Sequence, residues 1–153
     1  MSGQSNADPC FPKQAGELGK GDLMVFKDKR PGKINDYSVC KTGKHGHARI
    51  SFIAYDIFDG SKFEDSHPTT HNIMCPRLFI ENGLMTNYDD THVQYMKEDG
   101  ESGEIALPEY PEGYAESLMA SFDQCVKEGT NLNITIQRSM GLEQIMSHRT
   151  DKN

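Results

Sequence analysis

The 153-residue chain lacks any long run of apolar residues, and its mean hydropathy is −0.68. Spanning a bilayer takes about 20 consecutive, mostly apolar residues, so the sequence predicts no transmembrane helix. Residues 1–8 contain no apolar segment of the kind that a signal peptide needs, and no glycine follows Met1 to accept a myristoyl group. We therefore expect a cytoplasmic protein with no membrane partner.

Paired cysteine motifs are also missing. The four cysteines, at positions 10, 40, 75 and 125, are scattered along the chain and form no Cys-x-x-Cys pair. In a chain without a secretion signal such thiols are expected to stay reduced. The sequence therefore predicts no disulfide framework.

A catalytic constellation is absent as well, since no nucleophile, base and orienting acid occur at a recognisable spacing. The pair Gly43-Lys44 resembles part of a phosphate-binding loop. That loop needs a glycine five residues before Gly43 and a Ser or Thr after the lysine, but Ser38 and His45 occupy these positions. We therefore expect a protein that is not an enzyme and needs no cofactor.

One metal-binding alternative stays open. His67, His71 and Cys75 are spaced four residues apart, and imidazole and thiolate are the ligands that zinc prefers. However, Pro68 and Pro76 interrupt any helix that would align the three side chains. The competing interpretation is that His71 hydrogen-bonds in a turn and Cys75 is a small buried apolar group, and our main prediction contains no metal.

Charge is divided unevenly along the sequence. Through Phe79 the chain has 11 Lys and Arg against 9 Asp and Glu, and from Ile80 onward it has 5 against 14, which gives +2 and −9. Between Lys20 and Arg49 the local net charge is +5. This distribution favours contact between the first half and a polyanion. The candidate RNA or ribosome contacts are Lys27, Lys29, Arg30, Lys33 and Arg49.

Short strand patterns separated by turns dominate the chain and predict a mainly β protein with two small domains. Residues 1–16 have no periodicity and read as a flexible tail, followed by domains over residues 17–78 and 79–153. In the second domain, apolar residues at helical spacing predict one helix over residues 114–127. A weaker helical pattern covers residues 142–149. Strands with one intervening helix are compatible with an OB-type barrel.

The segment of residues 41–48 is the most informative part of the sequence. Its glycines can adopt positive φ and remove side-chain bulk, so the chain can reverse sharply and present a lysine. Strand-like patterns flank it on both sides, which predicts a hairpin with Lys44 exposed at its tip. The segment consists of Lys41, Thr42, Gly43, Lys44, His45, Gly46, His47 and Ala48.

This segment, together with DIFDGSKFED at residues 56–65 and PTTHN at residues 68–72, resembles the eukaryotic translation initiation factor 5A family. That family carries hypusine, a modified lysine, and Lys44 matches the modified position. The resemblance runs from about Phe11 to the C-terminus and is loose after Arg77. Residues 38–40 depart from the small hydroxyl residues that are common in the family.

The resemblance implies an SH3-like β barrel followed by an OB fold. It implies a translation factor that binds the 80S ribosome and reaches along the P-site tRNA with hypusine, which promotes peptide-bond formation at stalled, proline-rich sequences and assists termination. It also implies deoxyhypusine synthase, deoxyhypusine hydroxylase and spermidine as the source of the modification, with residues 41–47 recognised by these enzymes. A weak homodimer and a general single-strand RNA-binding module stay open.

Overall fold

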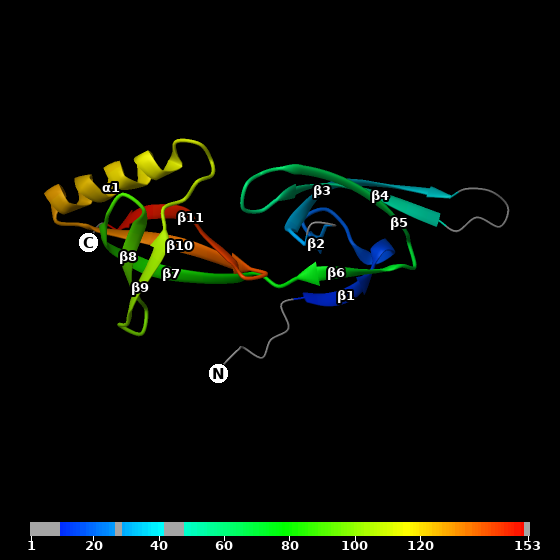
Figure 1. The fold of residues 1–153 in the computed structure, drawn as a ribbon, viewed down its shortest axis with the longest axis horizontal. Helices are drawn as coiled ribbons and strands as arrows, with labels where there is room; N and C mark the ends of the chain where they lie inside the picture. Colours follow the sequence, from blue (N-terminus) through cyan, green and yellow to red (C-terminus); the bar gives the residue numbers. More distant parts are fainter. Residues whose placement is uncertain (1–9, 27–28, 42–47, 152–153) are drawn as a thin grey trace. The chain divides into compact units, whose positions relative to one another are not determined.

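The computed structural model describes residues 10–26, 29–41 and 48–151, which form two compact units divided after Arg77 (Figure 1). Strands dominate both units, and α1 (Tyr114–Glu128) is the one α-helix in the described residues. The expected mainly β fold is confirmed. Within the same residues, no helix is long and apolar enough to cross a membrane.

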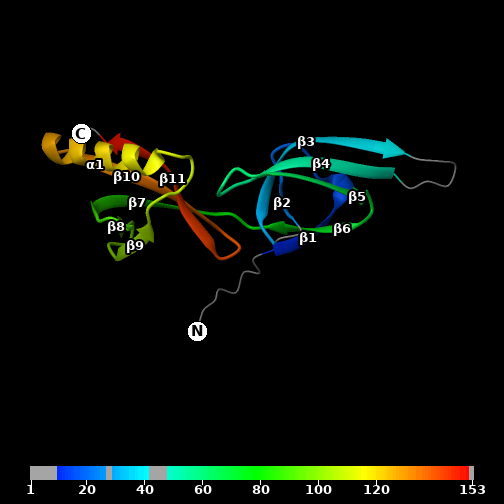
Figure 2. The ribbon, with the colours of Figure 1, turned by 45° about the horizontal axis from the view of Figure 1, so that its top comes forward.

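The first unit contains a four-stranded antiparallel sheet in the order β2-β3-β4-β5 and a two-stranded pair, β1-β6 (Figure 2). The short 3₁₀ helix η1 (Ala15–Glu17) follows β1. The arrangement is consistent with the expected SH3-like barrel. The strands are β1 (Cys10–Gln14), β2 (Leu23–Val25), β3 (Pro31–Lys41), β4 (Ala48–Asp56), β5 (Lys62–Pro68) and β6 (Asn72–Pro76).

Alternation along β4 shows how the sequence builds this core. Ile50, Phe52 and Ala54 point inward and are almost fully buried, whereas Ser51 and Tyr55 are exposed on the other face. This period of two is the pattern expected for a strand with one buried face. The core also takes side chains from the other elements of the unit, namely Ala15, Leu18, Met24, Phe26, Ile34, Ile73 and Cys75.

The prediction of a flexible tail is wrong for residues 10–16, which form β1 and the start of η1. β1 pairs in register with β6, from Cys10 opposite Pro76 to Gln14 opposite Asn72. The next residue, Ala15, is fully buried, and its N–H donates to the carbonyl oxygen of His71 at 2.9 Å. Because the partner strand lies far along the chain, nothing in the local sequence pattern reveals this strand.

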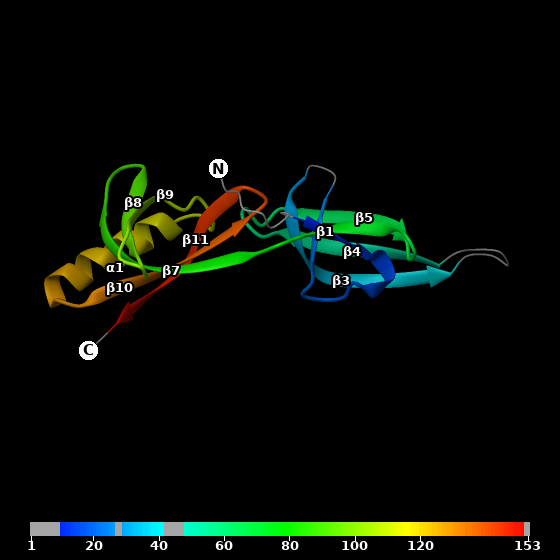
Figure 3. The ribbon, with the colours of Figure 1, turned by 90° about the horizontal axis from the view of Figure 1, so that it is seen from below.

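The second unit contains a five-stranded antiparallel sheet in the order β11-β10-β7-β8-β9, and α1 packs against β7, β10 and β11 (Figure 3). Strands with one helix between the third and fourth form the expected OB-fold arrangement. Its core consists of Met85, Val93, Tyr95, Ile105, Leu118, Cys125, Leu132, Ile134, Ile136 and Ile145. The strands are β7 (Phe79–Tyr88), β8 (His92–Lys97), β9 (Ser102–Ala106), β10 (Asn131–Ser139) and β11 (Leu142–Asp151).

The helix lies where its apolar spacing predicts. Leu118 and Cys125 are buried, and Gly129 ends the helix with φ +70° while its N–H contacts the carbonyl oxygens of Cys125 and Val126. A left-handed glycine at this position is a common way to satisfy the last carbonyl groups of a helix. Val126 also falls at the apolar spacing of the helix, but it is 64% exposed.

The predicted helical stretch at residues 142–149 is wrong, because these residues form β11. A two-residue turn, Met140-Gly141, joins β11 to β10 with φ +54° and +80° at the two positions. The register then shifts between Thr135 and Ile136, so Met146 has no partner on β10. This bulge breaks the alternation of apolar residues and leaves a spacing that resembles a helix.

Candidate functional site

The β3–β4 hairpin carries the segment that the sequence singles out. The two strands stay paired from Gly32 opposite Asp56 to Lys41 opposite Ala48, so the ladder closes directly beside that segment. The prediction that Lys44 lies exposed at a hairpin tip stays a prediction. Six of the predicted residues lie outside the described residues, namely Thr42, Gly43, Lys44, His45, Gly46 and His47.

The part of β3 nearest this segment lies away from the core. Every residue from Asn35 to Lys41 is exposed, and Val39 is 56% exposed. The change begins at a β-bulge between Ile34, which is buried, and Asp36. The first part of β3 therefore contributes residues to the core, whereas its last part faces solvent.

A third strand supports the same end of the sheet. Arg49 of β4 lies opposite Pro68 of β5, and its Nη2 donates to the carbonyl oxygen of Ser66 at 3.4 Å. In the turn after β5, the N–H of Thr69 donates to the carbonyl oxygen of Ala48 at 2.9 Å. These contacts fix the first residues of β4, directly after residues 42–47.

The predicted cationic contacts fall into two groups. Lys29, Lys33 and Arg49 are exposed, as is Lys41 at the end of β3. Lys27 lies outside the described residues. Because exposed cations are accessible to phosphate, Lys29, Lys33 and Arg49 stay predicted contacts and Lys41 is a further candidate.

Arg30 differs from these exposed cations, because its guanidinium forms an ion pair with a buried carboxylate. Its Nε donates to Oδ2 of Asp56 at 2.7 Å and its Nη2 to Oδ1 at 3.2 Å. The Asp56 side chain is fully buried and also accepts the N–H groups of Phe58 at 2.7 Å and Asp59 at 3.1 Å. The hydrogen bonds to Asp56 raise the pKa of Arg30. This ion pair weakens the case for Arg30 as a phosphate contact.

The metal-binding alternative finds no support in the geometry. Cys75 is buried in the core with its thiol 3.7 Å from the carbonyl oxygen of Ile73, and burial raises the pKa of that thiol. The rings of His67 and His71 instead stack on each other. In the described part of the chain, no three His, Cys, Asp or Glu side chains gather as a metal-binding group. The alternative is not favoured.

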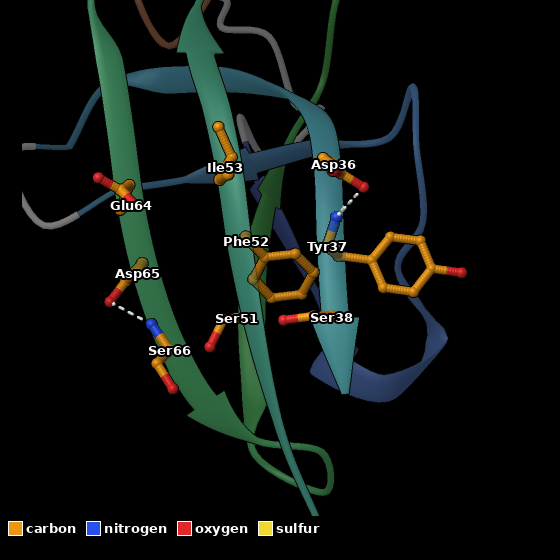
Figure 4. A pocket seen from close by; sticks show the side chains of 9 residues that line it. All are labelled: Asp36, Tyr37, Ser38, Ser51, Phe52, Ile53, Glu64, Asp65 and Ser66. Carbon is orange, nitrogen blue, oxygen red and sulfur yellow. Dashed lines mark hydrogen bonds between the residues drawn. The ribbon is translucent and has the colours of Figure 1, made fainter. Parts of the chain in front are cut away.

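The outer face of the β3–β4–β5 sheet has the opposite charge to that expected for an RNA contact. A hollow of about 540 Å³ there is lined by carboxylates, including Asp36 and Glu64, and by a row of serines in register, Ser38, Ser51 and Ser66 (Figure 4). We therefore expect a polyanion to meet the end and the exposed strand residues of the hairpin, and not this hollow. Sequence reasoning missed this face, although alternation in β4 could have located it.

In the second unit Arg138 forms several hydrogen bonds within the protein. Arg138 donates to Oε1 of Glu81 at 2.5 Å, to Oε1 of Glu143 at 2.9 Å and to the Tyr95 hydroxyl at 3.1 Å. These bonds tie β10 to β7, β8 and β11. The unit as a whole has a large excess of acidic residues, so its surface gives no basis for binding RNA by charge.

Comparisons with known proteins cover both units. Residues 9–71 match the family model described as translation initiation factor 5A-like, N-terminal. Residues 80–149 match the model described as eukaryotic elongation factor 5A hypusine, DNA-binding OB fold. The two matches together span most of the chain.

Individual relatives agree with the family models. Eukaryotic translation initiation factor 5A-1 of Schizosaccharomyces pombe is 38% identical over 148 residues, which is 96% of this chain and 90% of that protein. Eukaryotic translation initiation factor 5A-2 of Saccharomyces cerevisiae is 38% identical over 95% of this chain and 88% of its own length. A solved structure of a translation initiation factor eIF-5a family protein from Naegleria fowleri superimposes with a TM-score of 0.82 at 34% identity, covering 93% of this chain and 99% of that one.

Proposed function

Because the chain belongs to the eukaryotic translation initiation factor 5A family, we propose that it acts in the cytoplasm on the 80S ribosome through hypusine at Lys44. The family is one of translation factors. In the proposed mechanism the modified lysine reaches along the P-site tRNA toward the peptidyl-transferase centre. It promotes peptide-bond formation at stalled, proline-rich sequences in elongation and assists termination.

The observation that carries the proposal is the closed ladder beside residues 42–47. Lys41 and Ala48 are paired, and the contacts of Thr69 and Arg49 support the start of β4. A short segment between two paired strands is a suitable support for a side chain that must reach a crowded site. Gly43 and Gly46 on either side of Lys44 leave space for a partner to approach the lysine.

The chemistry of the arm fits a positioning role. Adding an aminobutyl group to lysine gives a long chain with two cationic nitrogens, which suits contacts with phosphate and ribose oxygens. The protein would contribute orientation and charge, while the ribosome supplies the reacting groups. The chain would then need no bound cofactor, since hypusine is a covalent modification derived from spermidine.

The modification requires two enzymes as partners. We propose that deoxyhypusine synthase transfers the aminobutyl group from spermidine to the Lys44 amine and releases 1,3-diaminopropane. Deoxyhypusine hydroxylase would then complete hypusine by replacing a C–H of the added arm with a hydroxyl, using dioxygen and a reductant. Lys41, Thr42, Gly43, His45, Gly46 and His47 surround the lysine and would be the residues that these enzymes recognise. Peptide mass spectrometry of protein from its native cells should find the modification on Lys44.

The direct test is the substitution Lys44→Arg. Arginine keeps a positive charge, but its guanidinium cannot accept the aminobutyl group. We expect the variant to fold normally, since arginine keeps the positive charge on a similar stem, yet to give no growth in cells depleted of their own factor. The matched control is Lys62→Arg on β5, an exposed lysine of the same sheet, which should support growth. Growth with Lys44→Arg equal to wild type would refute the hypusine mechanism.

A further inference from the structure

Two histidines stack beside the candidate hairpin and are not used by the proposed function. The rings of His67 and His71 lie 5.5 Å apart between centroids and only 3° from parallel. His67 is held from the side, because its Nε2 lies 2.8 Å from Oδ2 of Asp65. The His71 ring therefore rests on an aromatic ring whose position is already fixed.

The backbone of His71 is fixed as well. Its N–H donates to the carbonyl oxygen of Pro68 at 2.9 Å, and its own carbonyl oxygen accepts the N–H of Ala15 at 2.9 Å. The side chain is nevertheless exposed. Among the described residues, His67 is the one aromatic ring that stacks on it. A ring that is anchored on one side and exposed to solvent is preorganised to stack on a further planar group.

The histidine pair lies at the end of the sheet where the hairpin segment begins. His67 of β5 is directly opposite Ile50 of β4, and two residues later Thr69 donates to the carbonyl oxygen of Ala48. The exposed cation Lys41 of β3 lies opposite Ala48, which is on the same face of β4 as Ile50, whereas Arg49 is on the other face. The histidine pair and the positive charge of Lys41 therefore lie on one face at this end of the sheet.

We propose that His71 is a stacking platform for an unpaired RNA base that lies next to the hairpin. Unpaired bases stack on aromatic side chains, histidine included, and Lys41 would contact a neighbouring phosphate. The inference rests on the proposed function, since the RNA that reaches His71 is the RNA brought to the hairpin. It adds a contact that does not require the modified lysine.

The surroundings favour RNA over an aromatic side chain of a protein. The stretch from Lys20 to Arg49 has a local net charge of +5, which attracts a polyanion. Stacking of this kind tolerates any base, so we expect little sequence preference.

The test uses the full-length protein and an oligouridylate that contains a single 2-aminopurine, whose fluorescence falls when it stacks. We expect His71→Ala to weaken binding by roughly fivefold or more, which is the lower end of the range for one stacked base, and to abolish the fluorescence change. His71→Phe keeps an aromatic face without the imidazole and should bind within about twofold of wild type. The matched control is Tyr55→Ala, which removes an exposed ring from the opposite face of the sheet and should have no effect.

Equal binding and equal fluorescence change for wild type and His71→Ala, or no fluorescence change with wild type, would overturn the proposal. Loss of 80S ribosome binding with unchanged oligonucleotide binding would assign His71 to a protein contact and would also overturn it. Lys44→Arg separates the two proposals. It should abolish growth but leave the 2-aminopurine signal intact, so either proposal can fail while the other stands.

Discussion

The two long hairpins of the molecule use similar strands for different purposes. β10 and β11 are joined by Met140-Gly141 alone, and Leu132, Ile134 and Ile136 of β10 are at most 1% exposed. β3 and β4 instead end on the six residues 42–47, and every residue of β3 from Asn35 to Lys41 is exposed. β10 contributes to a core along its length, whereas β3 has a buried base and an exposed end.

Charged residues follow the same division. In the second unit Arg138 forms ion pairs with Glu81 and Glu143, so its positive charge is neutralised within the sheet. In the first unit Lys33 and Lys41 are exposed on β3 and form no ion pair with the described residues. A strand that contributes little to the core is free to carry residues chosen for binding, because their replacement costs little stability. Stability and function should therefore respond to different hairpins.

The largest expected effect is on stability and compares the two hairpins directly. Ile134→Ala removes a fully buried side chain from β10 and should destabilise the second unit by about 2–5 kcal/mol. Val39→Ala shortens an exposed aliphatic side chain on β3 and should change stability by less than about 0.5 kcal/mol. Urea unfolding followed by circular dichroism measures both. Equal losses would show that the end of β3 is packed against something in solution.

The second prediction concerns RNA affinity. Replacing Lys29, Lys33 and Lys41 by glutamine should make ribosome binding less sensitive to salt, since each lost phosphate contact lowers the slope of log affinity against log salt by about 0.7–0.9. At physiological salt we expect roughly a tenfold or greater loss of affinity. Binding titrations at several salt concentrations measure the slope.

The control for this prediction comes from the acidic unit. Glu98, Glu101 and Glu104 are exposed on β9 and the turn before it, and their replacement by glutamine should not weaken binding. If it does, or if the lysine variant keeps the slope of the wild type, the RNA-facing surface has been assigned to the wrong unit.

Local patterns predicted the parts of the fold that depend on local contacts. The helix and the alternating core of β10 could be found because their apolar residues repeat at regular intervals. β1 could not be found, because it exists only through pairing with β6. β11 was misassigned because the bulge at Met146 broke its alternation.

The site divides in the same way. Exposure of Lys33, Lys41 and Arg49 agrees with reasoning from charge alone. Arg30 looked equivalent in the sequence, but its partner Asp56 is 26 residues away and becomes a neighbour only in the folded sheet. His71 gave no signal as a platform, since its parallel stack on His67 depends on the geometry of the β5–β6 turn.

The smallest expected effect concerns the turn that joins β10 and β11. Met140 and Gly141 both have positive φ, which is characteristic of a tight two-residue turn in which Asn-Gly is the preferred pair. Met140→Asn should therefore relieve backbone strain, although it loses some apolar contact because Met140 is half-buried. We expect a net stabilisation of about 0.5 kcal/mol, or a rise of roughly 2–4 °C in the Tm of the second unit. The matched control, Met74→Asn, places the same change on an exposed position of β6, where asparagine has no turn to favour and should not stabilise. A fall in Tm for Met140→Asn would mean that the apolar contacts of Met140 outweigh its strain, so that side-chain packing, more than turn conformation, closes this hairpin.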